Sequence, residues 1–169
     1  MTNMEATVEI TGGRNEGKNK KILAVLSLIG FALLSYSFWL SSRPVEIISI
    51  HQKNNYSSVL VRNFPFTDKG KINWWLKNKG ILKEKYNIPK PASDGFYTVI
   101  FWDFGEGYQK EDKYDRLCFE DMKTQKNCID KNAIFSVDHS RNMGTTFVVY
   151  DGSDYRLDHN GEIVKIQHK

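Results

Sequence analysis

Cys118 and Cys128 are the residues whose chemistry the sequence defines best, because they are its only cysteines and stand ten positions apart. In an oxidising compartment such a pair forms a disulfide, which would close a short loop and stabilise the fold by about 3 kcal/mol. A redox-active pair requires the spacing Cys-x-x-Cys, and a zinc site requires histidines at ligand spacing. Neither pattern is present, so we predict a structural disulfide.

Asp138, His139 and Ser140 have the residue types of a hydrolytic triad, but a triad is assembled in space and not from three successive residues. Along a strand the side chain of His139 points away from both of its neighbours. The four histidines are scattered and form no metal motif, at positions 51, 139, 159 and 168. We expect polar residues at the end of a strand here, and no active site.

Carboxylates crowd one further region, at Asp103, Glu106, Glu111 and Asp112. Paired carboxylates can bind Ca²⁺ or act as general acid and base. Their spacing matches no EF-hand loop, and the glycines among them are not followed by the lysine and serine of a phosphate-binding loop. We therefore predict structural or partner-facing roles for these acids, and we assign the chain no catalytic residue, no metal site and no cofactor.

The compartment of all these residues is set by an apolar stretch without charge, ILAVLSLIGFALLSYSFWL, at residues 22–40. As an α-helix, 19 residues rise about 28 Å, close to the ~30 Å hydrocarbon core of a bilayer. A helix in the core of a globular domain is rarely apolar on every face over this length. The stretch is therefore a membrane span or an export signal.

The basic residues that flank the span lie mainly in front of it, at positions 14, 18, 20 and 21, whereas only Arg43 follows it closely. The positive-inside rule then makes residues 1–21 a cytoplasmic leader and places residues 43–169 outside, in the periplasm of a Gram-negative envelope. A cleaved signal peptide is the alternative, but the apolar run is too long and no small-x-small motif precedes a plausible cut. We predict a retained single-pass anchor in the inner membrane.

The residues after the anchor, about 127 of them, suffice for one domain. Alternating and β-branched segments predict strands at 45–51, 57–62, 96–104, 115–119, 133–137, 145–150, 155–157 and 162–166. Turns at Asn54-Asn55, Asp151-Gly152 and Asn160-Gly161 predict three hairpins, and residues 122–130 are expected to be a loop. The expected fold class is α+β, a mostly antiparallel sheet with one helical segment packed on it.

That helical segment is predicted at about 68–86, where the apolar positions fall on one face. Gly80 is expected to break it, since glycine after lysine makes an acceptable C-terminal cap. Trp74 falls on the other side of the helix and has no predicted packing partner. It is therefore a candidate for contact with a partner.

The net charge of +4 is unevenly distributed. Residues 68–90 contain seven lysines and two acids, whereas residues 91–169 contain ten basic and fourteen acidic residues. In one interpretation the helix is a solvated face balanced by an acidic sheet, and in the other it is a basic surface for anionic lipid or an acidic partner. The small positive charge of the domain argues against nucleic-acid binding.

Several segments resemble a family of enterobacterial membrane proteins of unknown function: RPVEIISIHQ from Arg43, NFPFTDKGKINWWLKNKGILKEKYNIPKP from Asn63, YTVIFWDFGEGY from Tyr97, DRLCFEDMKTQKNCIDKN from Asp115, and the terminal GEIVKI. The leader before Lys20 takes no part in the resemblance. The resemblance implies a small single-pass protein with an exported domain and supplies no catalytic residue. Families of this kind often occur among variable toxin and immunity clusters, which implies protection against a toxin that acts in the periplasm.

We therefore predict a non-enzymatic, protein-binding domain, such as an immunity protein, held at the periplasmic face of the inner membrane. The residues assigned to partner binding are Trp74, Lys71, Lys77, Asp103 and Glu106. The expected partners are the membrane and one protein, with no nucleic acid and no small-molecule ligand. The alternative is an envelope structural or assembly factor that acts through complexes within the membrane.

Overall fold

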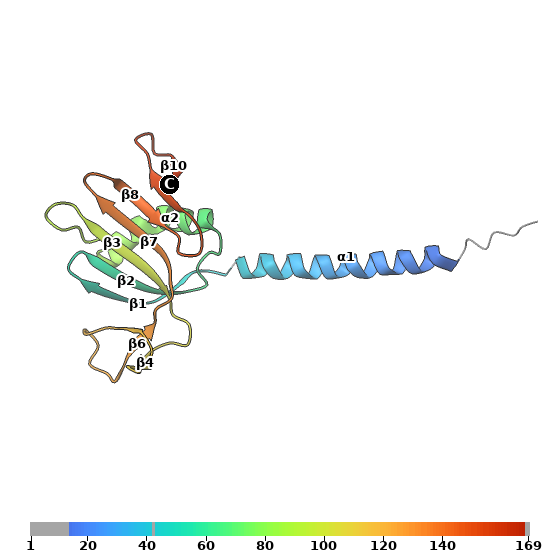
Figure 1. Cartoon of the computed structure of the whole chain (residues 1–169), viewed down its shortest axis with the longest axis horizontal. Coiled ribbons are helices and arrows are strands. Elements are labelled where there is room, and N and C mark those ends of the chain that lie inside the picture. The colour runs from blue at the N-terminus through green and yellow to red at the C-terminus, as the bar shows by residue number, and fades with distance from the viewer. Residues whose placement is uncertain (1–13, 42, 168–169) are drawn as a thin grey trace, which may run out of the picture. The chain divides into compact units, whose positions relative to one another are not determined.

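The computed structural model of the chain describes residues 14–41 and 43–167 (Figure 1). The chain divides into two compact units, one ending at Ser42 and one beginning at Arg43, and each is described by itself. The first contains α1 (Arg14–Ser41), in which the window Asn19–Trp39 has a mean hydropathy of 2.0 and no buried residue. Leu28, for example, is 70% exposed. α1 is long and apolar enough to cross a bilayer, and it contains the predicted span.

The second unit is built on a seven-stranded sheet with the strand order β1-β2-β3-β7-β8-β9-β10 (Figure 1). Its strands are β1 (Glu46–Lys53), β2 (Tyr56–Arg62), β3 (Tyr97–Asp103), β7 (Ala133–Ser140), β8 (Gly144–Val148), β9 (Asp154–Leu157) and β10 (Ile163–Lys165). Together with one helix on the sheet, this architecture confirms the predicted α+β class.

The three predicted hairpins are confirmed. β1 pairs antiparallel with β2, β8 with β9, and β9 with β10. Asn54 in the first turn and Gly161 in the last have φ values of 57° and 82°, the left-handed conformation that asparagine and glycine tolerate best. Local turn chemistry therefore fixed these pairings.

The sheet is not wholly antiparallel, because β2 and β3 pair in parallel. A parallel pair needs a crossover, and α2 (Asp68–Tyr86) provides it. Thr67 caps the helix by accepting a hydrogen bond from the Gly70 amide at 3.1 Å. Asn87, in the left-handed conformation, ends it by donating to the carbonyls of the last turn.

The predicted break at Gly80 is wrong, because α2 continues through this residue for another six positions. The packing of Leu82, which is 1% exposed, holds the last turns on the sheet and offsets a helix-interior glycine that costs about 1 kcal/mol. A Cβ on Gly80 would meet no atom within 4 Å. No neighbour inside the domain therefore requires a glycine at this position.

Two apolar clusters lie on opposite faces of the sheet, as the alternation of strand side chains requires. Val59 and Val61 of β2 belong to the larger cluster, beneath α2. Leu60, between them, belongs to the smaller one together with Phe119 and Ile129. The second cluster attaches a further small sheet to the face that α2 leaves uncovered.

This small sheet consists of β4 (Gln109–Lys110), β6 (Lys126–Asp130) and β5 (Arg116–Cys118), in the order β4-β6-β5. The expectation that residues 122–130 form only a loop is therefore wrong. The segment KNCID has too little apolar alternation to predict a strand from sequence, but it forms β6 by pairing with β5 and β4.

Candidate functional site

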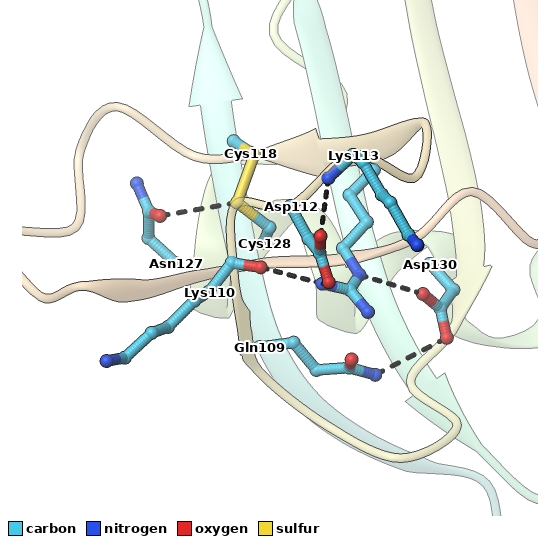
Figure 2. A network of polar contacts seen from close by, with 9 residues as sticks. Gln109, Lys110, Asp112, Lys113, Cys118, Asn127, Cys128 and Asp130 are labelled. Carbon is cyan, nitrogen blue, oxygen red and sulfur yellow. Dashed lines mark hydrogen bonds and ion pairs between the residues drawn. A yellow bond between two sulfur atoms is a disulfide. The ribbon is translucent and has the colours of Figure 1, made fainter.

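Cys118 and Cys128 face each other across the β5–β6 ladder and are joined by a disulfide, as predicted (Figure 2). Cys128 is fully buried. The bridge closes the segment from β5 to β6, which we call the disulfide loop (residues 118–128). It is therefore a cross-strand link between neighbouring strands, and it anchors both ends of this loop in the small sheet.

The guanidinium of Arg116 links several residues of the small sheet, and the Arg116 side chain is only 12% exposed. It donates to Asp130 Oδ1 at 3.2 Å and to the carbonyl of Lys110 at 2.8 Å, and it lies 3.6 Å from Asp112 Oδ2. Gln109 donates to the other oxygen of Asp130 at 3.4 Å (Figure 2). Asp112 and Asp130 are thus engaged in a structural network.

The disulfide loop is fastened to β1 by His51, a residue that is only 8% exposed. The imidazole stacks on Phe119 with 3.7 Å between ring centroids. Its Nδ1 lies 2.8 Å from the Asp121 carboxylate, and its Nε2 lies 2.8 Å from the Tyr108 hydroxyl. We call His51, Tyr108, Phe119 and Asp121 the His51 clamp.

The His51 clamp resembles an acid–base relay in its residue types, so its protonation decides what it can do. Burial raises the pKa of Tyr108, and the Asp121 charge raises it further, while a hydrogen bond with Ser49 opposes them. The phenol therefore stays protonated and can donate to Nε2, in which case Nδ1–H of the ring donates to Asp121. A phenol with a raised pKa is a poor nucleophile, and both ring nitrogens are occupied. The geometry favours a structural clamp.

Sequence reasoning missed this clamp. His51 and Asp121 are 70 positions apart, and no motif connects them. A bulge between Ile47 and Ser49 also shifts the alternation of β1, so the face to which His51 points could not be read by counting from the strand start. The one available signal was that Asp121 lies inside the loop that the two cysteines close.

Two of the predicted partner-binding residues, Lys71 and Trp74, contact the interior of the domain. Lys71 is 6% exposed, and its Nζ donates to the carbonyl of Ile134 at 3.2 Å, so it belongs to the interior and not to an exposed surface. Trp74 is half-buried and packs edge-on against Phe64 and Phe101, with centroid distances of 5.1 and 5.7 Å. The expectation that Trp74 has no packing partner is therefore wrong.

The remaining predicted residues lie on separate elements. Lys77 is exposed on α2, whereas Asp103 ends β3 and Glu106 is exposed in the turn after it. Asp103 accepts a long hydrogen bond from the Gly105 amide at 3.4 Å. Within residues 14–41 and 43–167, no three His, Cys, Asp or Glu side chains gather closely enough to hold a metal ion.

Asp138 accepts from Thr98 and Ser136 on one face of β7, while His139 stacks on Tyr97.

α2 is flanked by two open grooves. The first, of about 290 Å³, lies between α2, the Pro89–Pro91 connector and strands β3, β8 and β9; we call it the α2–β8 groove. Its apolar lining includes Trp75, Tyr97 and Phe147. The second, of about 250 Å³, lies along the opposite flank of α2, towards the start of β1.

The lysines on and after α2 carry charge that the fold does not neutralise. The ion pairs seen between described residues involve β1, the small sheet or the residues next to them: His51–Asp121, Lys53–Glu120, Arg116–Asp112, Arg116–Asp130 and Lys131–Asp115. Within that same part of the chain, none of the lysines from 69 to 90 pairs with a carboxylate. We call these lysines the uncompensated basic surface of α2, an arrangement that both charge interpretations allow.

Residues 16–167 match a family described as "Enterobacterial putative membrane protein". The match spans nearly the whole chain, so the protein belongs to this family, and the resemblance seen in the sequence is confirmed. It begins at residue 16, so the expectation that the leader before Lys20 takes no part is wrong. Neither a curated protein nor a solved structure shows a significant match. Together with the apolar α1, the family assigns the chain to a membrane.

Proposed function

We propose that this enterobacterial membrane protein is a non-enzymatic binding protein whose domain captures another protein in the periplasm. In this proposal α1 is a retained anchor in the inner membrane, with the basic leader in the cytoplasm. An immunity protein that blocks a toxin in the periplasm is the form of this function that we favour. An inhibitor of this kind needs a complementary surface and not catalytic groups.

The observation that carries the proposal is the uncompensated basic surface of α2. Lys77, Lys79 and Lys85 are exposed on the same helix without an acidic partner in the described chain. Exposed Ile81, 59% accessible, and half-buried Trp74 line the second groove together with Lys85. A surface that combines unpaired charge with apolar side chains is typical of a recognition site, because it steers a partner of opposite charge and then excludes water.

The length of the connection supports an action close to the bilayer. Only six residues separate Trp39, at the end of the apolar window, from Glu46, the first residue of β1. At about 3.5 Å per residue, the domain therefore begins within roughly 25 Å of the membrane surface. Such a tether keeps the domain where a protein entering the periplasm meets the inner membrane.

In vivo photo-crosslinking of the full-length protein tests the proposal. A photoreactive amino acid placed at Lys77 of α2 should give a crosslink to one soluble protein, identified by mass spectrometry. The same amino acid placed at Thr124, exposed on the disulfide loop, serves as the matched control and should give none. Crosslinks only to the protein itself or to other membrane proteins would contradict the proposal and favour an envelope assembly factor.

A further inference from the structure

We propose that the α2–β8 groove is the anchor site for a partner segment that carries a large apolar side chain beside acidic residues. The inference rests on the proposed function, and it names the site and the chemistry of the partner. The floor of the groove is apolar, because half-buried Leu76, Tyr97 and Leu157 line it together with Pro89 and Pro91. A floor of this kind accepts an aliphatic or aromatic side chain.

The size of the groove selects a side chain over a free ligand. Its volume of about 290 Å³ lies just below the range of roughly 300–1,000 Å³ that drug-sized ligands occupy. It is open to solvent along one side, as a site must be when the rest of the partner stays outside. Anchoring one apolar residue in a small pocket is how protein interfaces concentrate their affinity.

The positive charge on the rim of the groove favours a partner segment in which acidic residues flank the anchored apolar side chain. Lys79 and Lys83 both line the groove. Lys83 donates to Asn87 Oδ1 and to the Pro89 carbonyl, which are neutral acceptors and leave its charge uncompensated. Lys79 forms no ion pair in the described chain. Two positive charges beside an apolar floor complement a segment in which Asp or Glu flanks the buried side chain.

Gly80 provides an independent reason to place a partner here. It lines the same groove, and a Cβ in its place would meet nothing within 4 Å. The glycine is therefore not explained by packing within the domain, although it weakens the helix. A residue without a side chain on the lip of the groove lets the backbone of a docked segment approach α2 closely.

The test is a selection from a random-peptide display library on the full-length protein in nanodiscs of neutral lipid. Selected peptides should combine a large apolar residue with Asp or Glu. Their affinity should fall at least about tenfold for Lys79→Glu and for Gly80→Leu, and it should weaken with added salt. Lys69→Glu is the matched control, because it makes the same charge change at an exposed position of α2 that does not line the groove, and it should alter affinity less than about threefold.

Each contrary outcome overturns the inference. These outcomes are the recovery of no peptide, peptides without acidic residues, or peptides that bind Gly80→Leu as well as the unchanged protein. Binding of anionic vesicles in place of peptides would identify lipid as the occupant, and a dimer that Gly80→Leu abolishes would identify a second copy. If the crosslink at Lys77 persists while the groove variants have no effect, the binding function stands and only this site is wrong.

Discussion

Replacing Cys118 and Cys128 by alanine should destabilise the domain without changing its fold. The disulfide links two residues that already face each other in the β5–β6 ladder, so the folded state keeps its strand pairing without it. The main effect is on the unfolded chain, in which the loop is no longer closed. The loss can therefore be calculated from the sequence separation of the two cysteines.

That separation is ten residues. Closing a loop of this size removes an unfolded-state entropy equivalent to about 3 kcal/mol at 25 °C on the chain-entropy relation. Unfolding a domain of about 127 residues carries an entropy of roughly 0.27 kcal/mol/K near its midpoint. The double alanine variant should therefore melt about 11 °C below the oxidised protein.

The measurement is a thermal melt of the full-length protein in detergent, followed by near-ultraviolet circular dichroism, which reports on the aromatic core. Reductant should lower the melting temperature of the unchanged protein towards that of the variant, and it should leave the variant unaffected. A difference of less than about 3 °C between the oxidised protein and the variant would refute the reasoning. It would mean that the unfolded chain keeps this loop closed by other contacts.

Three further predictions concern the clamp, two glycines and one phenol. Asp121→Ala should lower the free energy of unfolding by about 1–3 kcal/mol, because it leaves the buried Nδ1–H of His51 without its acceptor. Gly80→Ala should stabilise the protein by about 0.5–1 kcal/mol, because alanine favours a helix and its Cβ has open space. Gly152→Ala should destabilise the protein by about 1–3 kcal/mol, because the new Cβ would lie 2.5 Å from a carboxylate oxygen of Asp68. The Tyr155 hydroxyl donates a hydrogen bond to the same Asp68 carboxylate, and this bond raises the pKa of the phenol. The stabilising contribution of this hydrogen bond should therefore be complete below about pH 10, the pKa of an unperturbed phenol, and should decline as the pH rises through the raised pKa.

Urea unfolding of the full-length protein measures the mutational effects, and Glu120→Ala is the control for Asp121→Ala. Glu120 is 85% exposed in its pair with Lys53, so its loss should change stability by less than about 0.5 kcal/mol. Equal effects of the two changes would contradict the role of the clamp. For the phenol, unfolding is repeated between about pH 9 and 11 with Tyr155→Phe, which should show a shallower decline. A decline of the same steepness would assign it to other groups.

The parts of this fold that the sequence predicts are those set by neighbouring residues. The turns at Asn54 and Gly161 hold backbone conformations that few other residues tolerate, so the hairpins followed from them. The start of α2 is set locally as well, because the side chain of Thr67 caps it. The disulfide followed from the number of cysteines together with the predicted compartment.

The remaining parts depend on contacts between distant segments. The parallel pairing of β2 and β3 depends on the path of α2 over the sheet, and strand β6 exists because β5 lies beside it. Lys71 is a charged residue on a lysine-rich helix, yet its long stem carries Nζ inward to a carbonyl of β7. A residue type gives no sign of such a contact, since the acceptor is 63 positions away.

Gly80 shows how a local rule for helix ends can fail. Glycine after lysine resembles a helix end, but the apolar contacts of Leu82 and the cap at Asn87 carry α2 past it. Helix propensity and packing within the domain would both be served better by alanine at this position. In the docking that we propose, this glycine leaves room for the backbone of an acidic segment beside Lys79 and Lys83, which line the same groove.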